Sequence, residues 1–388
     1  MPLTAFLGGP MKFKSFNETY TLLTLLLTMC MMYPNPQNDR KRALGIVLLS
    51  VLLIPQLVII VWDIYMRILL TDLNNGIRQL VMILCLSFII FKMVITLIWS
   101  GKFKRLLDKL NTDLNSFNDL PKDYQRIAAR GVARSQKLEK MWTVVLIIAV
   151  STFPFVALGL TIYSQFTKEP RKYMIHEAFI PMIEDVKYES PYFEIYTVYN
   201  IFMVWIVCCG YAGYDATFYV IVLHVSLKIK LFVPKITNLM ADSDVLTMRA
   251  KIGEIVRDQC SVYDFLKEIQ SCFELWLASM FFILMCQIAM GLCQLNVAGE
   301  NRLSYFMFAA AVSINLFLPC YVVSDLTSTA ASVSDYIYGC GWDLVPNPGV
   351  RKSVAFMIAR AQIPLNITPY DMFTCNMETF VSVCIEYS

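Results

Sequence analysis

Long apolar stretches alternate with shorter charged segments along this chain. At 1.5 Å per residue, a helix needs about 20 residues to cross a 30 Å hydrocarbon core. Six stretches meet that length, and a seventh, shorter and more polar, closes the chain. They are Ala43–Tyr65, Gly76–Ser100, Met141–Tyr163, Phe193–Leu223, Phe273–Leu295, Leu303–Val323 and Met372–Ser388. The pattern predicts an all-α integral membrane protein with seven transmembrane helices.

An earlier apolar run, Leu22–Tyr33, is too short to cross a membrane. Two lysines precede it, as in a signal peptide, but its end lacks the small residues of a cleavage site. We therefore predict a retained helix that lies in the membrane or dips into it.

Composition supports the membrane class. Of 388 residues, 57% are hydrophobic and 16% are charged, whereas an average soluble domain has about 45–50% apolar and 25% charged residues. This balance disfavours a soluble enzyme, a disordered protein and a nucleic-acid partner, and makes membrane lipid a necessary partner. No P-loop, G-x-S-x-G or H-E-x-x-H motif occurs in the sequence. We predict no enzymatic activity.

The twelve cysteines lie mostly inside apolar stretches, and no C-x-x-C pair occurs. Neither histidine is close in sequence to a pair of cysteines. Such cysteines behave as small hydrophobic residues. We therefore predict no metal site and no cofactor.

Lysine and arginine placement predicts the orientation, because cytoplasmic loops are enriched in these residues. With the N-terminus inside, the inner segments 1–42, 101–140, 224–272 and 324–371 contain 25 of the 33 lysines and arginines. The outer segments 66–75, 164–192 and 296–302 contain 6. We predict a cytoplasmic N-terminus and, with seven spans, an external C-terminus. G-protein-coupled receptors have the opposite orientation, and their Asp-Arg-Tyr and Asn-Pro-x-x-Tyr motifs are absent from the expected positions.

Two inner segments show apolar residues at helical spacing. The first stripe is Tyr124, Ile127, Ala128, Val132 and Leu138, and the second is Ile255, Val262, Leu266, Ile269 and Phe273. Both lead directly into a predicted span, so the third and fifth spans should continue as helices into the cytosol. Each stripe must be buried, either within the chain or in a cytoplasmic helical domain through which subunits associate.

Several short motifs near the C-terminus follow one another in a fixed order. The run 334–338 (Ser-Asp-Tyr-Ile-Tyr) precedes Trp342, and 360–365 (Arg-Ala-Gln-Ile-Pro-Leu) follows. Phe373, 378–380 (Glu-Thr-Phe) and the pair 387–388 (Tyr-Ser) complete the series. Together with the inverted seven-span pattern, this C-terminal third resembles an insect odorant receptor. The related gustatory receptors end with a Thr-Tyr-x5-Gln-Phe signature that the last span lacks, and they are the runner-up.

The resemblance implies an odorant-binding subunit of a ligand-gated, non-selective cation channel in olfactory signal transduction. Such a subunit joins a shared co-receptor in a heterotetramer in the plasma membrane of an olfactory neuron dendrite. The resemblance also implies a domain division. Segment 1–42 is a cytoplasmic N-terminus, 43–323 holds six spans, 324–371 is a cytoplasmic anchor, and 372–388 lines the pore. A membrane transporter of small apolar molecules is the alternative from another class.

The resemblance places a volatile odorant among the outer halves of the second, third, fourth and sixth spans. Those halves are rich in aromatic residues and methionine, which suits an apolar ligand. Helical spacing puts Ser151, Phe155, Leu158 and Ile162 on one face of the third span, and Tyr199, Met203 and Ile206 on one face of the fourth. With Tyr305 of the sixth span, these are the candidate ligand-binding residues. Helix packing or an interfacial aromatic belt is the alternative for each.

Charged residues inside a span are candidates for function. Glu378 and Glu386 are eight residues apart in the last span and lie close to one face, so we predict that they line a cation pore. The alternatives are that Glu386 meets outer water at the helix end and that Glu378 belongs to an inner capping arrangement. Lys92 of the second span either reaches towards the interface or pairs with an acid such as Asp215. The gate of such receptors lies beyond the Tyr-Ser pair, so no residue of this sequence is assigned to it.

Overall fold

The computed structural model describes residues 12–34, 39–70, 72–167, 170–239, 244–297 and 302–386, and these residues form helices joined by short connections. The helices are α1 (Phe16–Thr19), α2 (Thr21–Met29), α3 (Asp39–Leu69), α4 (Leu73–Ile98), α5 (Ser100–Ser116), α6 (Lys122–Ser164), α7 (Tyr192–Thr237), α8 (Val245–Val297), α9 (Arg302–Tyr338), α10 (Pro348–Ala361) and α11 (Met377–Glu386). Among them, α3, α4 and α6 to α9 are long and apolar enough to cross a membrane. Each contains one of the first six predicted stretches, except that α4 ends two residues before the second.

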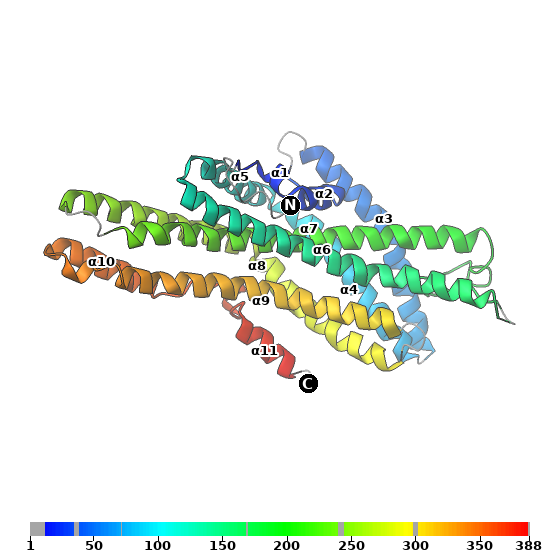
Figure 1. Cartoon of the computed structure of the whole chain (residues 1–388). Helices are drawn as coiled ribbons and strands as arrows, with labels where there is room; N and C mark the ends of the chain where they lie inside the picture. The colour runs from blue at the N-terminus through cyan, green and yellow to red at the C-terminus, as the bar shows by residue number, and fades with distance from the viewer. Residues whose placement is uncertain are drawn as a thin grey trace.

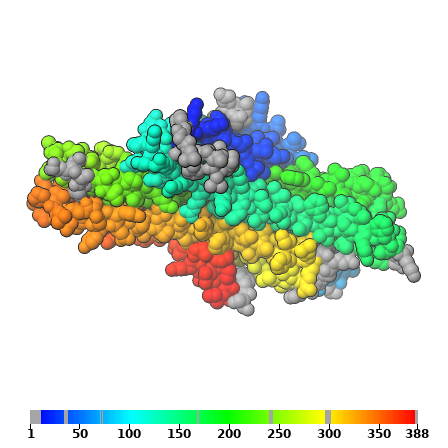
Figure 2. All heavy atoms as spheres, viewed as in Figure 1, coloured from blue at the N-terminus to red at the C-terminus, as the bar shows by residue number. Residues whose placement is uncertain are grey.

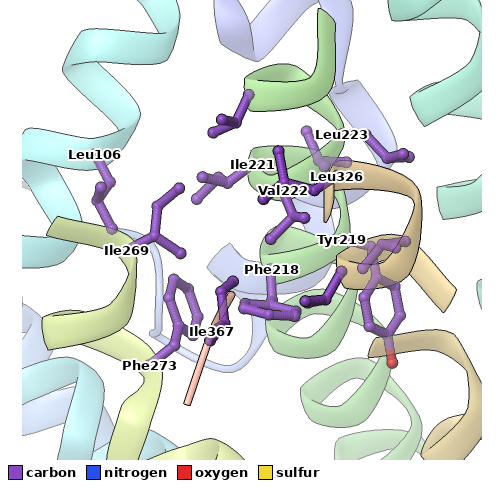
Figure 3. Packing of buried hydrophobic residues seen from close by; sticks show 14 of the residues in the cluster. Leu106, Phe218, Tyr219, Ile221, Val222, Leu223, Ile269, Phe273, Leu326 and Ile367 are labelled. Atoms are coloured by element: carbon purple, nitrogen blue, oxygen red, sulfur yellow. The ribbon is translucent and has the colours of Figure 1, made fainter. Parts of the chain in front are cut away.

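The long helices α6, α7, α8 and α9 lie roughly side by side and give the molecule an elongated shape (Figure 1). Helix α7 is the centre of the bundle, because its residues from Cys208 to Leu227 are buried without interruption. Side chains from α5, α8 and α9 surround it, among them Leu106, Phe273 and Leu326 (Figure 3). A helix that is covered on every side has no reason to show an amphipathic period.

The third and fifth predicted spans do continue as helices, since α6 has 43 residues and α8 has 53. The apolar stripe of α8, from Ile255 to Phe273, is buried within this chain against neighbouring helices. Packing inside the chain is therefore the correct alternative for that stripe. Helices α7 and α9 also extend well past their predicted ends at Leu223 and Val323.

The short apolar run near the N-terminus forms helix α2, which packs against α7 through Leu23, Leu26 and Leu27. The backbones come close at Gly213, where an added Cβ atom would lie 3.1 Å from the Leu27 nitrogen. The Leu23 backbone N–H also donates to the Glu139 carboxylate, at 2.8 Å. Helix α2 is therefore packed into the body of the protein. Its position relative to the membrane stays a prediction.

The last predicted span is partly wrong. Residues 372–376 are not helical, and α11 begins at Met377 with 10 residues, which rise about 15 Å. The reason is a sharp turn: Tyr370 and Asp371 have positive φ angles, and the Cys375 N–H donates to the Ile367 carbonyl at 3.0 Å. Asn376 then caps the new helix through the Thr379 N–H, at 2.9 Å. Helix α11 projects from the body of the molecule beside α9 (Figures 1 and 2).

Candidate functional site

An apolar cavity of about 310 Å³ lies between α6 and α7, towards the ends where segment 165–191 connects them. The α6 wall includes Ser151, Phe155 and Leu158, three of the four residues predicted on that face. The facing α7 wall includes Ile201, Val204 and Trp205. The cavity is open to the outside of the bundle, since Phe155 keeps 71% of its surface exposed. Small apolar molecules fit such a lining.

A second cavity, of about 690 Å³, lies between α4, α6, α9 and the connecting segment. Tyr305, the candidate from the sixth span, lines it, and its ring packs edge-on against Phe153 with the centroids 5.8 Å apart. Tyr173 and Ile175 border both cavities. The Tyr173 backbone N–H donates to the Thr161 hydroxyl at 2.9 Å, which holds this shared wall against α6.

The second cavity is the more polar of the two, and two residues of its lining, His176 and Glu177, are joined through Gln79 of α4. The Gln79 amide donates to the Glu177 carbonyl at 2.9 Å, which leaves its oxygen to accept from His176 Nε2 at 2.7 Å. Burial, together with the nearby Arg78 charge, lowers the pKa of His176 to about 3. His176 is therefore a neutral donor at physiological pH.

The remaining predicted ligand residues lie elsewhere. The Tyr199 hydroxyl donates to the Leu52 carbonyl on α3 at 2.8 Å, and the Ile206 carbonyl accepts from the Cys30 thiol at 3.5 Å. Met203 is buried in the hydrophobic core. Neither these three residues nor Ile162 lines either cavity. The structure therefore does not bring the predicted α6 and α7 faces to one cavity, and their binding roles stay predictions.

Sequence reasoning missed the α7 residues that do face the first cavity: Phe193, Thr197, Ile201, Val204, Trp205 and Cys208. They follow a helical stripe of their own, at spacings of four, four, three, one and three residues. Periodicity could not single out this stripe, because α7 is apolar on all its faces.

Of the two alternatives for Lys92, the ion pair with Asp215 is the correct one. Lys92 Nζ of α4 lies 2.5 Å from Asp215 Oδ1 of α7, and both side chains are fully buried. The ammonium group also lies 3.8 Å from the centroid of the Tyr211 ring, a favourable position for a cation–π interaction. The pair joins two helices deep in the bundle, away from both cavities.

The two acids predicted to line a pore belong to α11. Glu378 is exposed, while Phe380 of the same helix packs against Phe317 of α9 with ring centroids 5.4 Å apart. Helix α11 thus has one face on the bundle and one face, with Glu378, turned away from it. The side chain of Glu386 lies outside the described residues. Within the described part of the chain, no three His, Cys, Asp or Glu side chains cluster as metal ligands would.

A bundle of long apolar helices with cavities near one end defines a multi-pass membrane protein. Residues 72–384 match the family model described as 7tm Odorant receptor, so the chain belongs to this odorant receptor family. The family is one of receptors and not of enzymes, and it favours the odorant receptor over the gustatory alternative.

Comparison with individual proteins agrees. Odorant receptor 30a of Drosophila melanogaster is 23% identical over 237 residues, which cover 58% of this chain and 59% of that protein. The match thus spans about three fifths of the length of this curated relative. The insect olfactory receptor OR5 of Machilis hrabei, solved with eugenol, is similar in fold, with a TM-score of 0.77 and 15% identity over 95% of each chain. A second OR5 structure gives 0.72 and 16%, again over 95% of each chain.

Proposed function

We propose that this protein is the odorant-binding subunit of a ligand-gated, non-selective cation channel. The observation that supports odorant binding is the apolar cavity between α6 and α7, where Ser151, Phe155 and Leu158 face Trp205. Its lining suits a small volatile molecule. The eugenol bound to OR5 belongs to a protein of the same fold. Tyr199, Met203, Ile206, Ile162 and Tyr305 stay candidates for a site that changes shape on binding.

The proposed channel is a heterotetramer with the odorant receptor co-receptor. Apolar side chains at the far end of the bundle support association, since Tyr338, Leu344 and Phe356 are largely exposed in the single chain. Exposed apolar side chains at one end of the bundle are available for contact with another subunit. In this proposal segment 324–371 is the cytoplasmic anchor, the N-terminus is inside, and the C-terminus is outside. The location is the plasma membrane of the olfactory neuron.

The proposed pore is lined by segment 372–388 of each subunit, through the face of α11 that bears Glu378. A carboxylate beside a water-filled path attracts cations, and screening by salt keeps the effect modest. The exposed residues of α11 include Glu378 and Ser382 as well as the apolar Val381 and Ile385, so the outward surface of this helix is polar in part.

The test is whole-cell recording from cells that express the receptor with its co-receptor. Odorants should evoke a cation current, and Glu386→Gln should reduce external calcium block more than Glu378→Gln does. Glu189→Gln, in the exposed connecting segment, is the matched control and should leave the block unchanged. Saturable uptake of a substrate without any current would support the transporter instead. Currents identical to the parent in both α11 variants at low ionic strength would remove these acids from the pore.

A further inference from the structure

The second cavity is chemically divided. Met82, Phe153 and Ile175 give it an apolar side, while Arg78, Arg171 and Lys172 line it with positive charge. Glu177 is the one acidic residue among the described residues of its lining, and His176 is neutral. A cavity with an excess of cations and an apolar side matches an amphiphilic ligand that has a negative or electron-rich head.

Arg78 has few hydrogen-bond partners. Its guanidinium has five N–H donors, yet within the described residues it makes one hydrogen bond, from Nη2 to the Glu177 carbonyl at 2.9 Å. That carbonyl also accepts from Gln79. The side chain is 13% exposed and lines the cavity, so a ligand there can take the place of water on its free donors. A cation in this position gains from a further acceptor.

The nearby carboxylate does not meet this need. Glu177 Oε2 lies 4.0 Å from Arg78 Nη1, too far for a hydrogen bond, and the Glu177 side chain is 52% exposed. Its other oxygen accepts from the Tyr188 hydroxyl at 3.4 Å. Lys172 Nζ forms an ion pair with Glu194 Oε1 at 3.4 Å, and Glu194 does not line the cavity. A forked guanidinium with free donors is the group that best recognises a carboxylate, through two parallel hydrogen bonds.

We infer that the cavity between α4, α6, α9 and segment 170–188 binds small aliphatic carboxylic acids as ligands, with the carboxylate on Arg78 and the alkyl chain towards Phe153 and Tyr305. This inference rests on the proposed function, and it adds a second ligand site, separate from the α6–α7 cavity, for one class of the molecules that the receptor detects. A neutral ester of the same chain keeps an acceptor but loses the charge attraction. An amine of the same chain brings a second cation to Arg78 and is excluded.

The experiment compares three probes of equal chain length on cells that express the receptor with its co-receptor: hexanoic acid, methyl hexanoate and hexylamine. For the parent receptor, hexanoic acid should activate at the lowest concentration, methyl hexanoate at a higher one, and hexylamine should not activate. Equal sensitivity to acid and ester, or activation by the amine, would overturn the inference without any variant. Absence of current with every odorant tested, despite surface expression, would instead overturn the proposed function.

Variants of Arg78 test the residue assignment. Arg78→Gln should raise the half-maximal concentration for hexanoic acid about tenfold or more, as expected when a charge-assisted hydrogen bond is lost, while methyl hexanoate shifts much less. Arg78→Lys keeps the charge without the fork and should give an intermediate value. Arg302→Gln removes an exposed arginine at the start of α9 that does not line this cavity and is the matched control. Equal losses for acid and ester in Arg78→Gln would show that Arg78 supports the fold and does not bind the carboxylate. If Arg78→Gln fails to reach the surface, Arg78→Lys and the probe ranking of the parent decide the question.

Discussion

Helices α6 and α7 lie beside each other, yet they are buried to very different degrees. In the most apolar stretch of each, 17% of α6 is buried within the chain, compared with 78% of α7, although the α6 stretch is the more hydropathic. In a soluble protein the more apolar helix would be the more buried one. Here the order is reversed, because a surface that faces lipid must be apolar.

The buried helix can therefore contain groups that lipid would not accept. Between Cys208 and Leu227, α7 includes Tyr211, Gly213, Asp215 and Thr217, all covered by neighbouring helices. The exposed helix keeps Phe155 and Leu158 on its outer face beside the first cavity. Helix α7 therefore holds the bundle together through specific contacts. The exposed side chains of α6, in contrast, can be substituted without unfolding the protein.

The largest expected effect on stability comes from removing one partner of the buried ion pair between Lys92 and Asp215. Lys92→Met or Asp215→Leu alone leaves a charge without its partner in the core, which typically costs about 3–5 kcal/mol of folding free energy. The double variant Lys92→Met/Asp215→Leu should recover most of the loss. Thermal unfolding of the detergent-solubilised receptor measures this. Arg126→Met, which divides an exposed ion pair with Asp123, is the control and should change the midpoint little. A double variant as unstable as the single ones would mean that the charges themselves are required.

Truncation of one side chain in each helix should have a smaller effect on stability, and this effect should differ between α7 and α6. Met203 on α7 is 4% exposed, so Met203→Ala should cost about 2–5 kcal/mol. Phe155→Ala on α6 should leave the unfolding midpoint near that of the parent, and should shift odorant sensitivity several-fold, since an aromatic contact is worth on the order of 1 kcal/mol. Melting curves and dose–response curves on the same variants give both values. A stable Met203→Ala with altered odorant tuning would restore Met203 to the ligand site.

The smallest expected effect on stability comes from replacing a glycine by alanine, and it has opposite signs in α7 and α6. Gly213→Ala places a Cβ atom 3.1 Å from the Leu27 nitrogen and 3.2 Å from the Leu26 carbonyl carbon, so α2 must shift at a cost of about 1–3 kcal/mol. At Gly159 of α6 an added Cβ meets nothing within 4 Å, and Gly159→Ala gains up to about 1 kcal/mol from helix propensity. Unfolding midpoints of the two variants should move in opposite directions. A stabilised Gly213→Ala would show that α2 does not hold this close approach.

The class of fold and the positions of the long helices could be predicted from the sequence. Apolar stretches of about 20 residues are needed for any helix that crosses lipid, and they located the six long helices directly. The stripe from Ile255 to Phe273 predicted that α8 extends beyond its apolar span, because one buried face leaves a helical period. The charge of Lys92 in an apolar span required a partner, and Asp215 was a correct candidate.

Which helix faces pack against each other, in contrast, is seen in the tertiary structure and could not be predicted from the sequence. Helix α7 is apolar on every side, so its sequence could not tell that Trp205 faces the first cavity while Met203 faces the core. The turn at Tyr370 and Asp371, which shortens the last helix, depends on contacts with Ile367 and on positive φ angles that no apolar pattern encodes. Arg78 and the segment around His176 are far apart in the chain, and folding alone makes them one cavity. A hydrophobic period shows which face of a single helix is apolar. A binding site depends in addition on which helices and loops pack against that face.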